Sequence, residues 1–265
     1  MNDQQFRQLL NRYQFSWEGY RKVRRRVKKR LHRYMTSIHC PTMEDFLAEL
    51  DRNGKARDQC ERLMTVSISR FFRDRALWQW LKEQILPEMM TSGKNKVRCW
   101  SAGCACGEEV YSFKIIWDCM GSRYSPAPDL EVLATDINSV CLDRALIGIY
   151  PPSSLKEATK KIQSEYFEQK SGKQFFAVKS SLKTGITWEN HHLLSDPPDL
   201  DFDIVFLRNN ALTYYADLLK ATIFRNVMGC LKPRGILVLG SHERIPFETM
   251  DLTYVEPYPY VLRKR

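Results

Sequence analysis

The sequence predicts an α/β protein in which an open sheet domain follows an all-helical domain. Two observations lead to this prediction. Residues 1–90 show the three- and four-residue apolar spacing of helices, whereas from Lys96 onward short apolar runs alternate with helical stretches. Such alternation is typical of βαβ units built on a parallel sheet. We therefore divide the chain into a helical N-terminal domain, residues 1–90, and a sheet domain, residues 91–265.

The composition is that of a globular protein with free thiols. The chain has 265 residues, 43% of them hydrophobic, and can bury a large core. Its N-terminus lacks the apolar stretch of a signal peptide, and no apolar run approaches the ~18 residues of a membrane span. The eight scattered cysteines suit a reducing compartment, and no Cys or His pair has the spacing of a zinc site. We expect a cytoplasmic protein without a metal.

The net charge of +10 is concentrated in the helical domain. Nine Lys and Arg residues lie between Arg21 and Arg33, and apolar residues recur among them every three or four positions. This pattern predicts an amphipathic helix over residues 20–34 with a broad cationic face. Such a face attracts an acidic protein, RNA or an anionic membrane surface. A solvated helix surface without a partner is the alternative.

Other elements follow from local signals. Thr42 as N-cap and Asp45 in the capping-box position open a helix that Asn53-Gly54 ends. In the sheet domain we expect strands at 97–101, 131–135, 202–207 and 236–240, and helices at 108–120, 138–147, 154–167 and 216–231. The runs at 173–178 and 185–191 predict a small β-hairpin subdomain inserted over about residues 170–192.

The stretch at residues 97–116 is the most informative part of the chain. It reads as a buried strand, a turn of small residues and a helix. From Ser101 to Gly107 no side chain is larger than that of Cys, so a polar ligand can approach the backbone N–H groups at the helix N-terminus. The next apolar strand ends in Asp136. A small-residue loop beside a strand-end carboxylate is how open α/β sheets hold a nucleoside, with the acid on the ribose.

The details of this loop favour one nucleoside cofactor. Its spacing is Gly103-x-x-x-Gly107 rather than G-x-G-x-x-G, and Glu108 and Glu109 stand where a pyrophosphate would require positive potential. S-adenosylmethionine (SAM) has no phosphate and carries a cationic sulfonium and ammonium. We therefore favour SAM over a dinucleotide, with a plain strand–turn–helix as the structural alternative.

Taken together, the chain resembles the chemotaxis receptor glutamate methyltransferases, the CheR family. The resemblance covers roughly residues 6–245 and depends on several separate blocks in the same order. These blocks are Ser-Ile-Ser-Arg-Phe-Phe-Arg-Asp at 67–74, the loop at 100–112, Ala-Thr-Asp-Ile at 134–137 with 145–150, Phe-Leu-Arg-Asn at 206–209, and Leu-Lys-Pro-Arg-Gly-Ile-Leu-Val-Leu-Gly at 231–240.

The resemblance implies a Rossmann-like SAM-methyltransferase fold, with SAM as the methyl donor and S-adenosylhomocysteine (SAH) as the product. The residues that it assigns to the cofactor are Ser67, Ser69, Arg73, Ala102, Gly103, Glu109, Asp136, His192, Leu193, Arg208 and Asn209. It implies that Arg73 binds the SAM carboxylate and that Glu109, alone or with Glu108, binds the ammonium. It places Asp136 on the ribose hydroxyls. His192 and Leu193 would flank the adenine.

The chain also departs from the family pattern. Ser67 and Ser69 replace the usual Asn and Thr. Five residues beyond Arg208, where the family places a Tyr near the transferred methyl, the chain has Thr213, with Tyr214 one step later. The family's Gly-His-Ser-Glu reads Gly-Ser-His-Glu at 240–243. The inserted hairpin has only the turn Ser171-Gly172-Lys173, so docking of a receptor peptide on it is doubtful.

The chemistry implied is displacement of a methyl group from sulfonium to a nucleophile. A Glu carboxylate is ionised at pH 7 and needs no general base, so alignment supplies most of the catalysis. Arg208 with Tyr214 or Thr213 would orient the acceptor, and the basic helix at 20–34 would meet an acidic, chemoreceptor-like protein. Two alternatives remain open: another acceptor, such as a small-molecule acid, a thiol or RNA, and a SAM-binding sensor without turnover.

Overall fold

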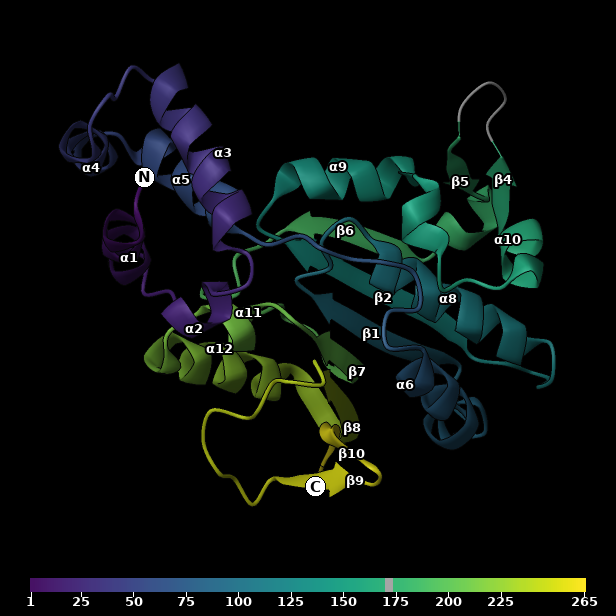
Figure 1. Cartoon of the computed structure of the whole chain (residues 1–265). Helices are drawn as coiled ribbons and strands as arrows, with labels where there is room; N and C mark the ends of the chain where they lie inside the picture. The colour runs from purple at the N-terminus through teal and green to yellow at the C-terminus, as the bar shows by residue number, and fades with distance from the viewer. Residues whose placement is uncertain (170–173) are drawn as a thin grey trace.

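The structure, a computed structural model, describes residues 1–169 and 174–265. A helical N-terminal part lies against one end of a seven-stranded sheet, and a small second sheet stands at another corner (Figure 1). The predicted α/β class is confirmed. The helices of the N-terminal part are α1 (Asp3–Arg12), α2 (Trp17–Tyr20), α3 (Arg24–Ser37), α4 (Met43–Arg52), α5 (Gly54–Met64), α6 (Arg75–Trp80), a π-helical turn (Leu81–Ile85) and α7 (Leu86–Met90).

The large sheet has the order β6-β2-β1-β7-β8-β10-β9. Its first five strands run parallel, and β10 and β9 close the edge antiparallel. The strands are β1 (Lys96–Ala102), β2 (Asp129–Asp136), β6 (Ile186–Asn190), β7 (Phe202–Leu207), β8 (Leu231–Leu239), β9 (Leu252–Val255) and β10 (Tyr258–Lys264). The helices of this part are α8 (Glu108–Gly121), α9 (Ser139–Ile147), α10 (Lys160–Tyr166), α11 (Ala211–Tyr214) and α12 (Asp217–Cys230).

The central strands β1 and β7 are buried on both faces, as is typical of parallel strands. Alternate strand residues such as Cys99, Val132 and Phe206 pack with α6, α7 and α8, and their neighbours pack with α12 on the opposite face. The helical part has its own core, built from α1 to α5, and Tyr214 and Tyr215 pack against it. Among the described residues, no helix is both long and apolar enough to cross a bilayer.

The predicted hairpin at 170–192 is wrong in its pairing. The run at 176–178 is β5, the middle strand of a small antiparallel sheet between β3 (Ile149–Tyr150) and β4 (Phe167–Gln169). The second run, β6, instead pairs parallel with β2 at the edge of the large sheet. Alternation of apolar residues predicts a strand but not its partner, which explains the error. The turn at 171–173 lies outside the described residues.

The helical predictions also need correction. The basic segment is not one helix over 20–34, because α2 ends at Tyr20 and a turn precedes α3. In the turn, the Val23 N–H donates to the Tyr20 carbonyl at 3.0 Å, and before α2 the Ser16 N–H donates to the Tyr214 carbonyl at 2.7 Å. Residues 65–74 are not helical either, and Phe72 and Asp74 have positive φ. The helix expected at 154–167 divides into a 3-10 turn (Pro152–Leu155) and α10, which Thr159 caps.

Candidate active site

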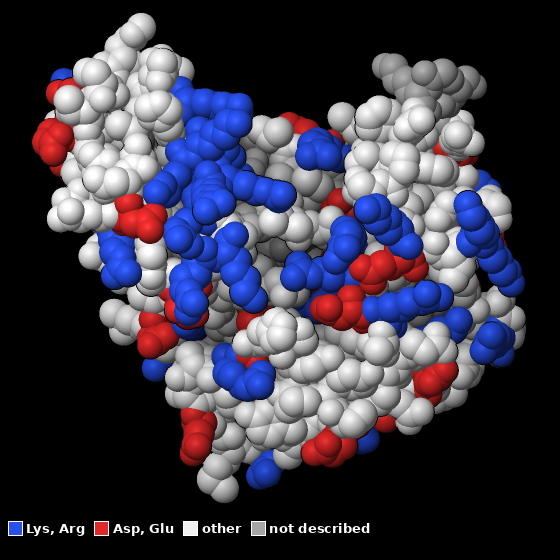
Figure 2. Space-filling model, in the orientation of Figure 1, with Lys and Arg blue, Asp and Glu red and all other residues white. Residues whose placement is uncertain are grey.

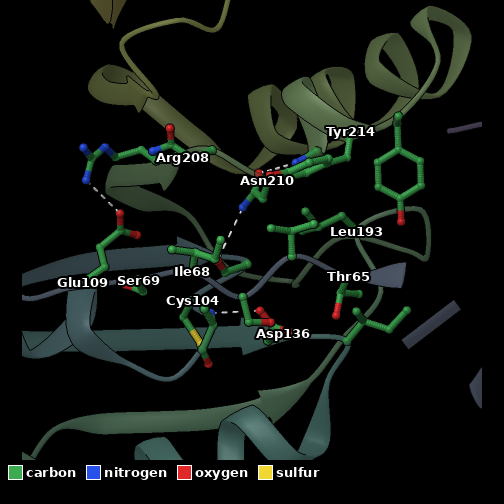
Figure 3. A pocket seen from close by; sticks show the side chains of 18 of the residues that line it. Thr65, Ile68, Ser69, Cys104, Glu109, Asp136, Leu193, Arg208, Asn210 and Tyr214 are labelled. Carbon is green, nitrogen blue, oxygen red and sulfur yellow. Dashed lines mark hydrogen bonds and ion pairs between the residues drawn. The ribbon is translucent and has the colours of Figure 1, made fainter. Parts of the chain in front are cut away.

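A deep cavity opens at the carboxyl ends of β1, β2 and β7 (Figure 3). This is the edge at which open α/β sheets bind ligands. The cavity and the open solvent space at its mouth together have an empty volume of ≈ 1020 Å³. The sheet part supplies its floor, and the helical part supplies a wall with Phe15, Tyr20 and the extended segment 65–70. Of the residues predicted to bind or act, those that line it are Ser67, Ser69, Arg73, Gly103, Glu109, Asp136, His192, Leu193, Arg208, Asn209 and Tyr214.

The small-residue loop after β1 is held by backbone contacts. The N–H groups of Gly103 and Cys104 both donate to the Thr135 carbonyl at 2.8 Å. Gly103 has φ +84°, and a Cβ there would lie 2.2 Å from Nδ2 of Asn210. The position therefore requires glycine. Ala102 is buried at the end of β1, and its carbonyl accepts from Asn210 Nδ2 instead of lining the cavity.

Asp136 connects this loop with the end of β2. Its Oδ2 accepts the Ala105 N–H at 2.8 Å, and its Oδ1 accepts the Asn138 N–H at 2.9 Å. Burial raises the pKa of Asp136, and the two amide donors oppose that shift in part. Each carboxylate oxygen has two lone pairs and uses one here. The remaining acceptor capacity of this cavity-lining residue suits a pair of hydroxyl donors.

Arg208, at the end of β7, is bound by two carboxylates. Its Nη2 lies 2.6 Å from Asp74 Oδ2 and its Nη1 lies 3.1 Å from Glu109 Oε2, with the side chain only 3% exposed. The guanidinium also lies over the Trp78 ring, 5.6 Å from its centroid. With both ends of its guanidinium paired, Arg208 holds Glu109 in place, and its predicted role toward an acceptor stays a prediction.

The two predicted glutamates have different environments. Glu109 lines the cavity and accepts from Ser101 Oγ at 2.8 Å. Glu108 turns away into the protein, where Ser154 Oγ donates to its Oε1 at 3.3 Å and burial raises its pKa. Glu109 is therefore the glutamate that a ligand in the cavity can reach.

Arg73 and Asn209 meet on one side of the cavity. The Arg73 guanidinium donates to the Ile68 carbonyl at 3.1 Å and to Asn209 Oδ1 at 3.2 Å. A guanidinium has five N–H donors, so several remain for an anionic ligand group. Asn209 has φ +55°, an uncommon conformation for a residue other than glycine.

His192 connects the sheet part with the helical part. Its Nδ1 accepts from the Leu194 N–H at 3.1 Å, and its Nε2 lies 3.0 Å from Glu61 Oε1 on α5. Because Nδ1 accepts, Nε2 must carry the proton and donate to Glu61. This contact holds the His192–Leu193 segment against the cavity.

Thr213 and Tyr214 point in different directions. Tyr214 lines the cavity, and its ring centroid lies 5.1 Å from that of Tyr20. The Thr213 hydroxyl instead donates to Oε1 of Glu243 at 2.6 Å. Of the two candidates for the family's tyrosine position, Tyr214 is the one that faces the cavity.

Comparison with known proteins gives this arrangement a family. The family model described as "CheR methyltransferase, SAM binding domain" matches residues 67–260. The chain belongs to the CheR family. It is 28% identical over 220 residues to a chemotaxis protein methyltransferase of Listeria innocua, covering 83% of this chain and 81% of that protein. It is 28% identical over 242 residues to chemotaxis protein methyltransferase 1 of Vibrio cholerae, covering 90% and 87%. The counterpart of Pseudomonas aeruginosa is 27% identical over 224 residues, covering 83% and 81%.

The protein is thus a SAM-dependent methyltransferase, and the predicted family and cofactor are confirmed. The cavity fits SAM chemically. Asp136, Arg73 and Glu109 line it. The lone pairs of Asp136 complement hydroxyl donors, the free N–H donors of Arg73 complement a carboxylate, and the Glu109 carboxylate complements an ammonium. The glycine loop keeps side chains out of the space between them.

Several residues in or beside the cavity were not predicted from the sequence. Asp74 stands within the quoted 67–74 block, so its place beside Arg208 could have been suspected. Asn210, next to the predicted Asn209, gave a similar hint. Phe15, Tyr20 and Tyr215 come from apolar patterns that read only as core, and no local signal marks them as cavity residues.

Proposed function

We propose that this methyltransferase transfers methyl groups to glutamate side chains of an acidic, chemoreceptor-like protein. The observation that carries the proposal is a cationic groove beside the cavity. It lies between α3 and α9 and shares Val66, Ser67 and Ile68 with the cavity wall. The basic residues that line it are Arg26, Lys29, Arg30, Arg33 and Arg144. Figure 2 shows Lys and Arg gathered over α3 beside a hollow in this face.

The groove residues differ from the other basic residues of the segment. Lys28 and Arg24 already contact Asp3, at 2.8 and 3.4 Å. Lys29 and Arg33 line the groove and are exposed, so they remain available to an acidic segment. A groove of one sign of charge beside a reaction site draws in a partner of the opposite sign and orients it. The relatives' designation as chemotaxis methyltransferases supports a chemoreceptor as that partner.

The chain's own residues would perform the following tasks. SAM, when bound, supplies a methyl group activated by its sulfonium. Asp136 would hold the ribose hydroxyls, Arg73 the cofactor carboxylate and Glu109 the ammonium, with Arg208 holding Glu109 in place. His192 and Leu193 would border the adenine.

At the acceptor end, a glutamate carboxylate is already ionised at neutral pH, so no residue has to remove a proton. Tyr214, the aromatic residue at the cavity wall nearest Tyr20, would orient the carboxylate by its hydroxyl. The protein then contributes mainly alignment and exclusion of water, and good alignment can supply about 7–11 kcal/mol of the barrier.

Transfer of a labelled methyl group from SAM tests the proposal. The acceptors are a chemoreceptor cytoplasmic fragment and, as a matched control, the same fragment with its surface glutamates changed to glutamine. We expect label on the first, released as methanol by mild base, and none on the second. Label on RNA or on small acids or thiols but not on the fragment would overturn the proposed acceptor. SAM binding without transfer to any of them would indicate a sensor.

A further inference from the structure

One buried carboxylate outside the predicted set joins several parts of the site. Glu243, in the loop after β8, is 4% exposed. Its Oε2 accepts the N–H of Asn209 at 2.8 Å and the N–H of Gly240 at 2.7 Å, and its Oε1 accepts the Thr213 hydroxyl at 2.6 Å. A single side chain thus fastens the end of β8 to two positions in the segment that follows β7.

Two of these three contacts go to residues that adjoin the cavity groups. Asn209 is held by its N–H in a left-handed conformation, φ +55°, and in that conformation its Oδ1 reaches the Arg73 guanidinium at 3.2 Å. Thr213 is held by its hydroxyl, and the next residue, Tyr214, faces the cavity. Glu243 therefore does not line the cavity itself, but it holds Asn209, which does, and Thr213, which precedes Tyr214.

Burial of the Glu243 carboxylate is unfavourable by itself. Burial raises the pKa of Glu243, and the donors from Thr213, Asn209 and Gly240 oppose that shift in part. A buried carboxylate is costly unless its oxygens are satisfied. Here all three donors belong to the segments that follow β7 and β8, at the edge of the sheet that bears the cavity.

We propose that Glu243 is a positioning residue for the cofactor: it holds Asn209 in the conformation that aims Arg73 into the cavity. The proposal rests on the proposed placement of the cofactor carboxylate at Arg73. Glu243 acts through its acceptor atoms and not through its charge. A glutamine could keep its Oε1 on the two amide donors and turn its Nε2–H toward the Thr213 oxygen, whereas a methionine of similar length offers no comparable acceptor.

The test measures the affinity for SAH by calorimetry at a temperature where every variant is folded. We expect Glu243→Gln to stay within about threefold of the wild type, and Glu243→Met to bind SAH about tenfold or more weakly, since amide and hydroxyl donors lose their partner. Gly240→Ala should disturb the contact between Glu243 and Asn209 by crowding it, without removing a polar group. A Cβ there would lie 2.7 Å from Glu243 Oε2 and 2.9 Å from Asn209 Oδ1. Gly240→Ala should therefore also weaken SAH binding. If Glu243→Met does not fold, the SAH affinity of Gly240→Ala tests the proposal.

Asp203→Asn is the matched control for a loss of folding stability without a change in the cofactor site. Asp203 is 5% exposed near the start of β7, and it accepts from the Arg98 N–H at 2.9 Å and contacts Lys94 and Lys232. Its loss should lower the unfolding temperature and leave SAH affinity unchanged. If Glu243→Met and Gly240→Ala lower only the unfolding temperature, as the control does, Glu243 is structural and the proposal is wrong. Failure of the wild type to bind SAH would instead contradict the assigned cofactor cavity.

Discussion

The Asp136 carboxylate accepts the backbone N–H of Ala105 at 2.8 Å, which ties the end of β2 to the loop that follows β1. The same carboxylate therefore organises the small-residue loop and presents its remaining lone pairs to the cavity. A substitution there acts on both functions, because the loop loses an anchor while the cavity loses an acceptor.

Asp136→Ala should weaken SAH binding by about ten- to a hundredfold, the range expected when hydrogen bonds to a charged group are lost. Calorimetry with SAH measures this, and circular dichroism checks that the chain stays folded. Asp129→Asn, at the exposed start of the same strand, is the matched control and should bind normally. Equal affinity of Asp136→Ala and the wild type would remove Asp136 from the cofactor site.

Tyr214→Phe should lower kcat for the acceptor about tenfold while SAH affinity stays within twofold, because the hydroxyl orients the acceptor and not the cofactor. Steady-state rates at saturating SAM measure the change. Tyr254→Phe, at an exposed tyrosine of β9, serves as the control and should have no effect. An unchanged kcat for Tyr214→Phe would leave acceptor orientation to another group.

Neutralising Lys29 and Arg33 together by glutamine should raise KM for a macromolecular acceptor severalfold and leave SAH affinity alone, since both line the cationic groove. Lys22→Gln with Arg25→Gln removes the same charge from neighbouring residues outside the groove lining and is the matched control. If both pairs raise KM equally, overall charge and not the groove attracts the acceptor. If neither pair does, the segment is an ordinary solvated surface.

Asp203 should make stability depend on pH. Burial alone would raise its pKa, but the Arg98 amide and the ammonium groups of Lys94 and Lys232 outweigh burial and hold it below its usual value. A lowered folded-state pKa contributes stability above the unfolded pKa, and this contribution is lost as pH falls through the folded pKa. Asp203→Asn should therefore lower the unfolding temperature at pH 7 by roughly 2–6 °C.

The pH series supplies the decisive comparison for Asp203. The difference in unfolding temperature between Asp203→Asn and the wild type should shrink as pH falls below about 4, where the carboxyl of the unfolded chain begins to be protonated, and disappear below the lowered pKa of the folded state. A difference that stays constant over that range would show that charge on Asp203 contributes nothing.

Local signals sufficed for the part of the site built on consecutive residues. The glycine loop and Asp136 each stand directly after an apolar strand, and parallel strands bring their ends together, so their proximity followed from the pattern. The same reasoning placed Arg208 at the cavity edge. It could not show that Asp74 and Glu109 occupy the Arg208 guanidinium, because that depends on how the 65–74 segment crosses the sheet.

Contacts between distant segments were beyond the sequence. Glu243 contacts Thr213 across 30 residues, and nothing in the sequence Gly-Ser-His-Glu indicates which segment its side chain faces. Phe15 and Tyr20 reach the cavity only because the helical part docks on α11. The short run that forms β6 had the correct alternation, but its partner, β2, depends on the surface left at the sheet edge.

A crystal structure with SAH bound tests the central claim, that the cavity between the glycine loop and Asp136 holds the cofactor, most directly. We predict the ribose hydroxyls within hydrogen-bonding distance of Asp136, the amino-acid carboxylate on Arg73 and the adenine beside Leu193. SAH found elsewhere on the protein, or in the cavity with no contact to Asp136, would contradict the account.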